Sequence, residues 1–351
     1  MIMKILLDIS SHGFGHIAQT APIANGLNRH GFEWTVRSGA QYEMLKGKLN
    51  FSFEHIAEAS DIGMAMRNAI DVDVGATEAA YAAFHDDWEA RVWKEARWIA
   101  AFDLVLSNVS YLPLKAAHLA GVPSAAFCSL NWADLYWHYC KRNPGAGKIH
   151  AQMLDAYRCA SFFRITPAMP MPDLEQAVAI GPIAAIGNNR QDEIRRMLGV
   201  DPGVKLGLVS MGGLPFPVHF EKWPDSEHIH WIVPKYAGRS DMTSYEKLGV
   251  PFSDLVASAD VLVTKPGYGS FAEAGAAGIP VLYVPRGDWP EEEYLTGWLR
   301  ENGRCLELDR ASFESGKLAH AVDALLAQPE KPVPQMSGAA DAVSLIGALI
   351  T

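Results

Sequence analysis

Two histidines, His12 and His16, flank a pair of glycines in the segment S-S-H-G-F-G-H at residues 10–16. The apolar run 2–9 before it predicts a buried strand, and the residues after it predict a helix. A histidine in the first turn of a helix feels the positive end of the helix dipole, which favours the neutral imidazole that a general base needs. We therefore expect at least one of them to act on a ligand, because open α/β sheets bind ligands at the carboxyl ends of strands.

Other interpretations of the same segment stay open. One histidine could simply cap or pack, and two histidines four residues apart could hold a metal. No third ligand stands out in the sequence, so no metal is predicted. Gly13 and Gly15 form only G-x-G, short of a dinucleotide fingerprint. Pro22 leaves the helix start open, either near Gly15 with a kink or near Thr20 with the proline in the first turn.

A second glycine turn lies in the stretch 261–286, V-L-V-T-K-P-G-Y-G-S-F-A-E-A-G-A-A-G-I-P-V-L-Y-V-P-R. It predicts a strand at 261–264, a turn at Gly267 and Gly269, a helix at 270–277 ended by Gly278, and a strand at 279–284. Backbone N–H groups at a helix N-terminus bind anions, so the turn predicts a seat for a phosphate-bearing ligand. Lys265 could neutralise the phosphate or lie at a solvated strand end.

Two further features of this half could serve the same ligand. Glu273 lies three residues after Ser270, the spacing of a capping box, and spacing alone favours that role over binding ribose hydroxyls. Met211, Gly212 and Gly213 follow a predicted strand at 205–210. Their N–H groups could face a diphosphate, or they could form an ordinary turn.

Acidic and aromatic runs are less specific. The run 286–293, R-G-D-W-P-E-E-E, could bind sugar hydroxyls or form a surface acidic loop. Asn131, Trp132 and Asp134 begin a run of aromatic and polar residues that could line an acceptor pocket or pack at a domain interface. The acidic clusters at 71–73 and 85–87 are expected to be solvated.

Strands and helices alternate along the chain, which predicts parallel sheets covered on both faces. A chain of 351 residues predicts two domains. We expect the first at 1–167, a linker at 168–182, the second at 183–338, and an apolar helix at 339–351 that packs back on the first. One long helix is expected at 77–100.

Composition limits the classes of binding partner and predicts the cellular compartment. The formal net charge of -10 argues against nucleic acid and anionic membranes as main partners. The four cysteines form no C-x-x-C pair, which fits a reducing cytoplasm. The first apolar run is too short for a signal peptide, and no segment reaches the roughly 20 apolar residues of a membrane span. We therefore expect a cytoplasmic protein.

Three segments carry a resemblance that covers nearly the whole chain. They are H-G-F-G-H-I-A at 12–18, S-N-V-S-Y-L-P-L-K-A-A-H-L-A-G-V-P at 107–123 with N-W-A-D-L-Y-W-H-Y, and K-P-G-Y-G-S-F-A-E-A at 265–274 with P-E-E-E-Y-L. The chain resembles the glycosyltransferase-like N-terminal region of plant L-arabinokinases and, more distantly, peptidoglycan N-acetylglucosaminyltransferases and glucuronosyltransferases. The kinase half of the arabinokinases is missing, so no sugar-kinase activity is implied.

The resemblance implies a glycosyltransferase-B fold, with two Rossmann-like domains facing across a cleft. It implies that His16 lies near the reacting centre and that the second domain holds a nucleotide-diphosphate sugar, with a uridine diphosphate sugar favoured. It raises ribose binding by Glu273 above the cap. The Asp-Gln or His-Gln pair that usually contacts the donor sugar is missing. The donor site implied comprises Gly13, Gly15, Met211, Gly212, Gly213, Lys265, Gly267, Tyr268, Gly269, Ser270, Glu273, Asp288, Glu291 and Glu292, and the acceptor site His12, Asn131, Trp132 and Asp134.

The favoured hypothesis is a metal-independent inverting glycosyltransferase in which His16 deprotonates a hydroxyl of a small-molecule or glycan acceptor. Backbone N–H groups and Lys265 would stabilise the leaving diphosphate. Two alternatives remain, because fold does not fix function. One is a non-catalytic nucleotide-sugar sensor or accessory subunit, and the other is a nucleotide-sugar epimerase of the same fold.

Overall fold

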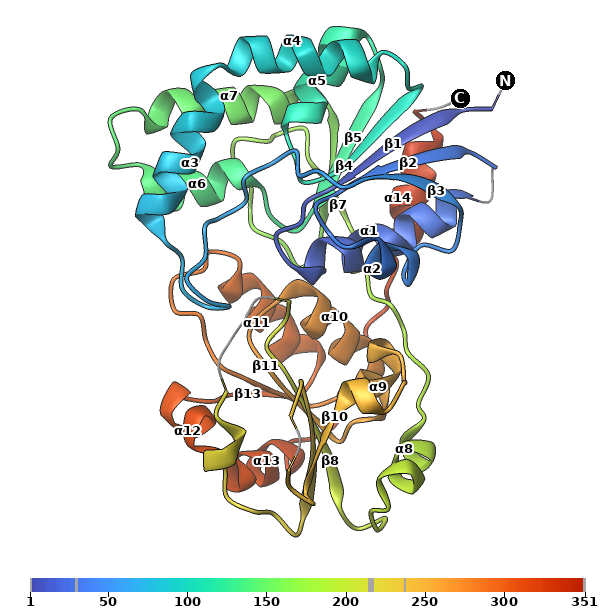
Figure 1. Cartoon of the computed structure of the whole chain (residues 1–351), viewed down its shortest axis with the longest axis vertical. Coiled ribbons are helices and arrows are strands. Elements are labelled where there is room, and N and C mark those ends of the chain that lie inside the picture. Colours follow the sequence, from blue (N-terminus) through green and yellow to red (C-terminus); the bar gives the residue numbers. More distant parts are fainter. Residues whose placement is uncertain (1, 29–30, 214–217, 237, 350–351) are drawn as a thin grey trace. The chain divides into compact units, whose positions relative to one another are not determined.

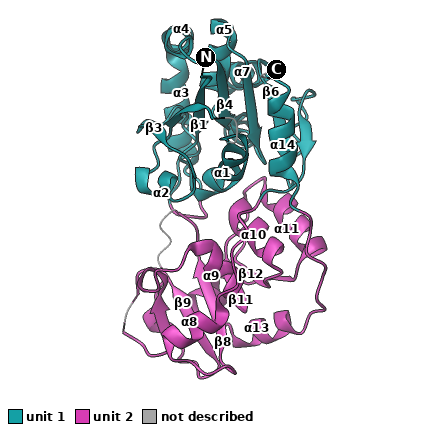
Figure 2. Ribbon diagram, turned by 90° about the vertical axis from the view of Figure 1, so that its right-hand side faces the viewer, with its two compact units in different colours: residues 1–67, 72–183, 336–351 teal, residues 68–71, 184–335 magenta. Residues whose placement is uncertain are grey.

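A computed structural model describes residues 2–28, 31–213, 218–236 and 238–349 (Figure 1). The chain divides into two compact units, coloured separately in Figure 2. Unit 1 comprises residues 1–67, 72–183 and 336–351, and unit 2 comprises residues 68–71 and 184–335. Each unit is built on its own sheet, so each is described by itself.

Unit 1 contains a seven-stranded sheet in the order β3-β2-β1-β4-β5-β6-β7, in which every pairing is parallel. The central strands are buried along nearly their whole length, as expected of a sheet covered on both faces. The strands are β1 (Lys4–Ile9), β2 (Glu33–Arg37), β3 (Phe53–Ile56), β4 (Leu104–Asn108), β5 (Ser124–Cys128), β6 (Ser161–Ile165) and β7 (Val178–Ile180).

Helices cover both faces of this sheet. On one face α4 packs on α5 (Figure 1). Both helices bury apolar side chains against β1 and β4. Helix α14, from the end of the chain, packs on α1 and touches β7. The helices of unit 1 are α1 (Phe14–Leu27), α2 (Tyr42–Lys46), α3 (Val74–Asp86), α4 (Trp88–Ile99), α5 (Leu112–Ala120), α6 (Trp132–Cys140), α7 (Ala146–Arg158) and α14 (Gly338–Gly347).

Unit 2 contains a six-stranded parallel sheet in the order β10-β9-β8-β11-β12-β13. Its strands are β8 (Lys205–Ser210), β9 (Ile229–Val233), β10 (Met242–Ser244), β11 (Val261–Thr264), β12 (Val281–Tyr283) and β13 (Cys305–Glu307). Its helices are α8 (Gln191–Leu198), α9 (Phe252–Ser258), α10 (Tyr268–Ala277), α11 (Glu292–Asn302), α12 (Arg310–Ser315) and α13 (Ala319–Leu326), with single 3-10 turns at Phe220–Lys222 and Tyr245–Lys247.

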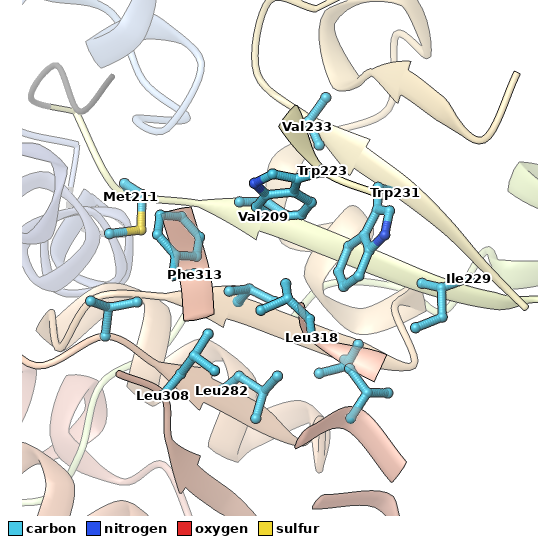
Figure 3. Packing of buried hydrophobic residues seen from close by; sticks show 14 of the residues in the cluster. Val209, Met211, Trp223, Ile229, Trp231, Val233, Leu282, Leu308, Phe313 and Leu318 are labelled. Atoms are coloured by element: carbon cyan, nitrogen blue, oxygen red, sulfur yellow. The ribbon is translucent and has the colours of Figure 1, made fainter. Parts of the chain in front are cut away.

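The core of unit 2 lies where α12 and α13 cover the strands (Figure 3). Phe313 is fully buried there, and its ring meets Trp223 at 5.8 Å between centroids. Trp223 in turn lies 5.4 Å from Trp231 of β9. This apolar packing fixes the sheet, and the turns at its carboxyl edge are fixed with it.

In each sheet the chain order reverses between the two strands at its centre. In unit 1 these strands are β1 and β4, whose last residues, Ile9 and Asn108, are register partners. In unit 2 they are β8 and β11, whose ends pair Ser210 with Thr264. The crevice outside the carboxyl ends at such a reversal is where open α/β sheets bind ligands. Both predicted glycine turns therefore follow a strand that ends at this point.

The prediction of two parallel α/β sheets is confirmed, but several local predictions for unit 1 differ from the structure. The helix expected at 77–100 is two helices, because Asp87 leaves helical geometry at φ -116° and ψ 39°. His85, expected to be solvated, is buried and bonded to Gln152 and Tyr111. Residues 168–182, expected as a linker, lie in unit 1, where β7 extends the sheet.

The chain returns to unit 1 after residue 335, where α14 is anchored near Gly181. Asp341 accepts hydrogen bonds from the Gly181 N–H (3.0 Å) and the Ser337 hydroxyl (2.9 Å). Among the described residues, no helix is long and apolar enough to cross a membrane.

We predict that Phe313→Ala destabilises the protein by about 3–5 kcal/mol, because it removes a fully buried ring and leaves a cavity. Met197→Ala in α8 is the matched control, since Met197 is 51% exposed and such changes stay within about 0.5 kcal/mol. Urea unfolding followed by circular dichroism measures both, and equal effects of the two substitutions would contradict this account of the core.

Candidate functional site

Helix α1 places His16 in its first turn. The helix begins at Phe14, and Gly13 precedes it with φ 96°, a left-handed conformation that glycine tolerates. The alternative start near Thr20 is therefore wrong, and Pro22 lies inside the helix. His16 is the third helical residue, at the carboxyl end of β1.

A chain of buried hydrogen bonds fixes the His16 ring. Gln19 Nε2 donates to the Ser129 hydroxyl (2.7 Å), and Asn108 Nδ2 donates to Gln19 Oε1 (3.1 Å). This leaves Asn108 Oδ1 facing His16 Nδ1 at 2.8 Å, and because an amide oxygen only accepts, Nδ1 must carry the proton. The lone pair is then on Nε2, the atom that can act as a base.

Burial keeps this imidazole neutral. It lowers the pKa of His16 to about 4, while the hydrogen bond to Asn108 acts in the opposite direction. The fall from 6.5 corresponds to about 3 kcal/mol, whereas a helix dipole supplies about 0.3–1 kcal/mol. Desolvation, rather than the dipole invoked from the sequence, is therefore the main cause.

Trp132 contacts both histidines and an aspartate. Its ring lies 5.5 Å from the His16 ring and 5.1 Å from the His12 ring. Its Nε1 donates to Asp61 Oδ2 at 2.6 Å. His12 Nε2 donates to the Met64 carbonyl at 3.0 Å, so His12 holds the loop that carries Asp61. Of the predicted acceptor residues, the structure brings His12 and Trp132 together with His16.

Asn131 and Asp134 belong to a different cluster. Asn131 caps α6, accepting from the Asp134 N–H at 2.8 Å, and its Nδ2 donates to the Asp134 carboxylate. Ligand atoms of Asp134, His150 and Asp173 lie within 4.8 Å of one another, so these three side chains could hold a metal ion. The sequence indicated no such group.

In unit 2 the Lys265 side chain lies between the two predicted glycine turns. A Cβ placed on Gly212 would be 3.4 Å from Lys265 Cε, and one placed on Gly267 would be 3.6 Å from its Nζ. Gly212 has φ 82° and needs glycine for that reason. Met211 before it is buried, and Gly213 after it is exposed. The turns after β8 and β11 therefore meet around one ammonium group.

The surroundings of Lys265 disfavour its charged form. Burial lowers its pKa to about 7, and Arg286 adds to the effect, while Glu291 and Glu292 oppose it. An anion bound beside the Nζ would favour the ammonium and raise this pKa again. The group is thus suited to respond to a bound phosphate.

The start of α10 differs from the prediction and changes the role of Glu273. The helix begins at Tyr268, with Gly267 as its N-cap, so Gly269 and Ser270 lie in its first turn. The capping box is therefore wrong, because Ser270 is already helical and no side chain caps this end. Glu273 is a buried residue of α10.

Part of the acidic run is folded back on its own loop, and part of it is exposed. Glu291 is 4% exposed and accepts from Trp289 Nε1 at 3.2 Å, while the Arg286 guanidinium lies 3.7 Å above the Trp289 ring. Glu292 accepts from the Arg286 N–H at 2.7 Å. Asp288 is exposed. Glu291 and Glu292 thus hold the loop in place beside Lys265.

Sequence reasoning missed Asn108 and Asp61. Asn108 lies inside the motif S-N-V-S that carries the resemblance, and the parallel pairing of β1 with β4 places it beside His16. Its position as the last residue of a buried strand was an available signal. Asp61 follows β3 in a loop with no periodic pattern, and no signal in the sequence marks it.

No family model matches the chain. It is 23% identical over 324 residues to the L-arabinokinase of Arabidopsis thaliana, an alignment that covers 88% of this chain and 31% of that protein. The chain thus spans about a third of the length of this relative.

Solved glycosyltransferases share the fold along the whole chain. The calicheamicin glycosyltransferase CalG4 superposes with a TM-score of 0.65 at 16% identity, covering 100% of this chain and 99% of its own. VinC, in complex with DTDP, gives 0.60 at 15% identity and 99% and 98% coverage. Arabidopsis thaliana UGT89C1, in complex with quercetin, gives 0.59 at 12% identity and 100% and 94% coverage. The glycosyltransferase-B fold predicted from the sequence is confirmed.

We predict that Asn108→Asp raises the pKa of His16 from about 4 by about 1–3 units, because a carboxylate beside Nδ1 favours the imidazolium. An NMR titration of the histidine ring protons measures it. His85 is the internal control, since burial also lowers its pKa to about 4 and it is bonded to Gln152 instead. A His16 pKa that does not move would contradict the hydrogen-bond chain.

Proposed function

We propose that this protein is an inverting glycosyltransferase that moves a sugar from a nucleotide diphosphate to an acceptor hydroxyl. The single observation that carries the proposal is the oriented base. His16 is neutral, its Nδ1–H is held by Asn108, and its Nε2 is left as the basic atom. Similarity to glycosyltransferases of known structure along the whole chain supports the reaction class.

Unit 2 is proposed to hold the donor. The N–H groups at the start of α10 and the ammonium of Lys265 supply positive charge where a diphosphate would lie. Glu273 is assigned to the ribose hydroxyls, and Asp288 to the donor sugar. VinC has been solved with DTDP, which supports a nucleotide-diphosphate sugar as the donor class; we favour uridine as the base.

The chemical step follows from these roles. His16 Nε2 takes the proton of the acceptor hydroxyl as its oxygen attacks the anomeric carbon. The bond from that carbon to the diphosphate oxygen breaks, and the nucleoside diphosphate leaves with the electron pair. Lys265 and the α10 N–H groups stabilise the charge that develops on it, so transfer is proposed to be metal-independent. One displacement inverts the anomeric configuration.

We predict that His16→Ala lowers kcat about 10²–10⁴-fold, the range for loss of a general base, while donor affinity changes little. Product formation is measured by mass spectrometry with a panel of UDP-, dTDP-, GDP- and CDP-sugars and mixed hydroxyl acceptors. His85→Ala, which removes a buried histidine elsewhere in unit 1, is the matched control.

Unchanged turnover in His16→Ala would reject the base. Donor binding by the wild type with no product would instead support a nucleotide-sugar sensor, and epimerised donor without acceptor would support an epimerase.

We also predict that donor affinity falls as pH rises above 7, by up to tenfold per unit. Free Lys265 has a pKa of about 7, and a bound diphosphate needs the ammonium, so binding above that pH takes up a proton. Calorimetry in buffers of different ionisation enthalpy measures this uptake with the tightest-binding nucleotide sugar. Lys265→Arg, charged at every pH tested, is expected to abolish the pH dependence. An unaltered pH profile in that variant would exclude Lys265 as the proton acceptor.

A further inference from the structure

One carboxylate that shares Trp132 as a neighbour with His16 has no part in the proposed reaction. Asp61 lies in the loop after β3 and accepts a hydrogen bond from Trp132 Nε1 at 2.6 Å. The same indole packs against the rings of His12 and His16. The loop is closely fitted, because a Cβ on Gly63 would come within 2.7 Å of the His12 ring. Asp61 and both imidazoles are therefore fixed around one buried side chain.

The charge of Asp61 is not compensated by a cation. Its neighbour Asp8 pairs with Arg37 at 2.5 Å and accepts from the Ser60 hydroxyl at 2.6 Å. Across the described ranges, by contrast, no lysine or arginine pairs with Asp61. Desolvation raises the pKa of Asp61 to about 6, hydrogen bonds from Ser10, Trp132 and Ser110 oppose this effect, and the charge of Asp8 raises the pKa further. A carboxylate left in such surroundings lowers stability, and groups of this kind gather at functional sites.

We propose that the Asp61 carboxylate is a further acceptor-binding group, which accepts a hydrogen bond from a second hydroxyl of the acceptor. The acceptor is accordingly a polyhydroxylated, sugar-like molecule. An ionised carboxylate can only accept hydrogen bonds, and a hydroxyl is the donor that such an acceptor supplies. A flat apolar acceptor would cover the Asp61 carboxylate without donating a hydrogen bond to it. This inference rests on the proposed function, in which His16 deprotonates the first hydroxyl of the acceptor. Binding of a polyol by Asp61 can nevertheless be measured without the reaction.

A purely structural role for Asp61, holding Trp132 in place, makes the opposite prediction for stability. The Asp61→Asn side chain keeps an oxygen for Trp132 Nε1 and removes the charge. If the carboxylate serves a ligand, this variant is at least as stable as the wild type at pH 7.5. If it serves the fold, the variant melts at a lower temperature. Stability and acceptor binding are thus expected to move in opposite directions.

The sign of the pH dependence follows from the raised pKa. Below about pH 4 the Asp61 carboxyl is protonated in both the folded and the unfolded chain, so burial of its charge does not lower stability there. The loss of stability from this charge grows between about pH 4 and 6 and is constant above pH 6. The gain in melting temperature of Asp61→Asn is therefore expected to appear over the same pH range. Other ionisable groups that face Asp61 are Asp8 of β1, Tyr81 of α3, Tyr111 before α5 and Tyr157 of α7. Burial raises the pKa of each tyrosine, so these phenols stay neutral throughout.

The test compares wild type, Asp61→Asn and the control Asp103→Asn. Asp103 bonds the Lys4 N–H at 2.7 Å at the opposite, amino end of β1. Acceptor kinetics use D-glucose, D-xylose, N-acetyl-D-glucosamine and myo-inositol, with 4-nitrophenol as a flat, single-hydroxyl probe. Asp61→Asn is expected to raise KM for the best polyol at least tenfold and to leave donor binding within twofold, while KM for 4-nitrophenol, which has no second hydroxyl, rises by a smaller factor. An unchanged polyol KM, or a lower melting temperature at pH 7.5, would overturn the inference.

Binding measured without turnover separates this inference from the proposed function. Saturation-transfer NMR with the same polyols, on the full chain loaded with UDP, needs no reaction. Polyol binding lost in Asp61→Asn but kept in Asp103→Asn supports the inference even if no transfer is found. Transfer to 4-nitrophenol alone, with no polyol bound by the wild type, supports the proposed function and overturns the inference.

Discussion

The parallel pairing of two central strands in each sheet brings the candidate site residues together. Parallel strands end at the same edge, and the reversal of strand order between β1 and β4, and between β8 and β11, opens that edge to a ligand. Asn108 reaches His16 only because the ends of β1 and β4 are register partners. Lys265 reaches Gly212 because the ends of β11 and β8 are also register partners. Neither arrangement depends on residues that are close in sequence.

Desolvation then sets the protonation of both sites in the same direction. It favours the neutral imidazole of His16, the neutral amine of Lys265 and the neutral acid of Asp61. For His16 the neutral form is the working form of a base. In the proposed roles of Lys265 and Asp61 the charged form would be the working form, and a bound ligand would favour it. On this proposal the protonation of both groups changes on binding.

The sequence predicted the periodic parts of the fold and the glycine turns. Runs such as Lys205–Ser210 and Val261–Thr264 are strands at the predicted residues, because continuous apolar character marks a strand buried on both faces. β6 and β7 were missed, and β7 lies within residues 168–182, which were expected to form a linker. The division of 77–100 into two helices depends on the backbone of one residue, Asp87.

The site was predicted less completely than the fold, because several of its residues are brought together only by strand pairing and side-chain contacts. Glycine and histidine spacing indicated His16 and the turn after Lys265. Asn108 becomes part of the site through sheet register, and Asp61 through the side chain of Trp132, and neither relation is visible in local sequence. The capping box failed for a local reason. Gly267 takes the N-cap position, so α10 begins before Ser270.

A crystal structure of the protein with UDP tests the central claim most directly, namely that the two turns around Lys265 hold a diphosphate. The account predicts the β-phosphate at about 3 Å from Lys265 Nζ and from backbone N–H groups in the first turn of α10, within reach of charge-assisted hydrogen bonds. A nucleotide bound at another edge of unit 2, or in unit 1, with Lys265 untouched, would contradict it.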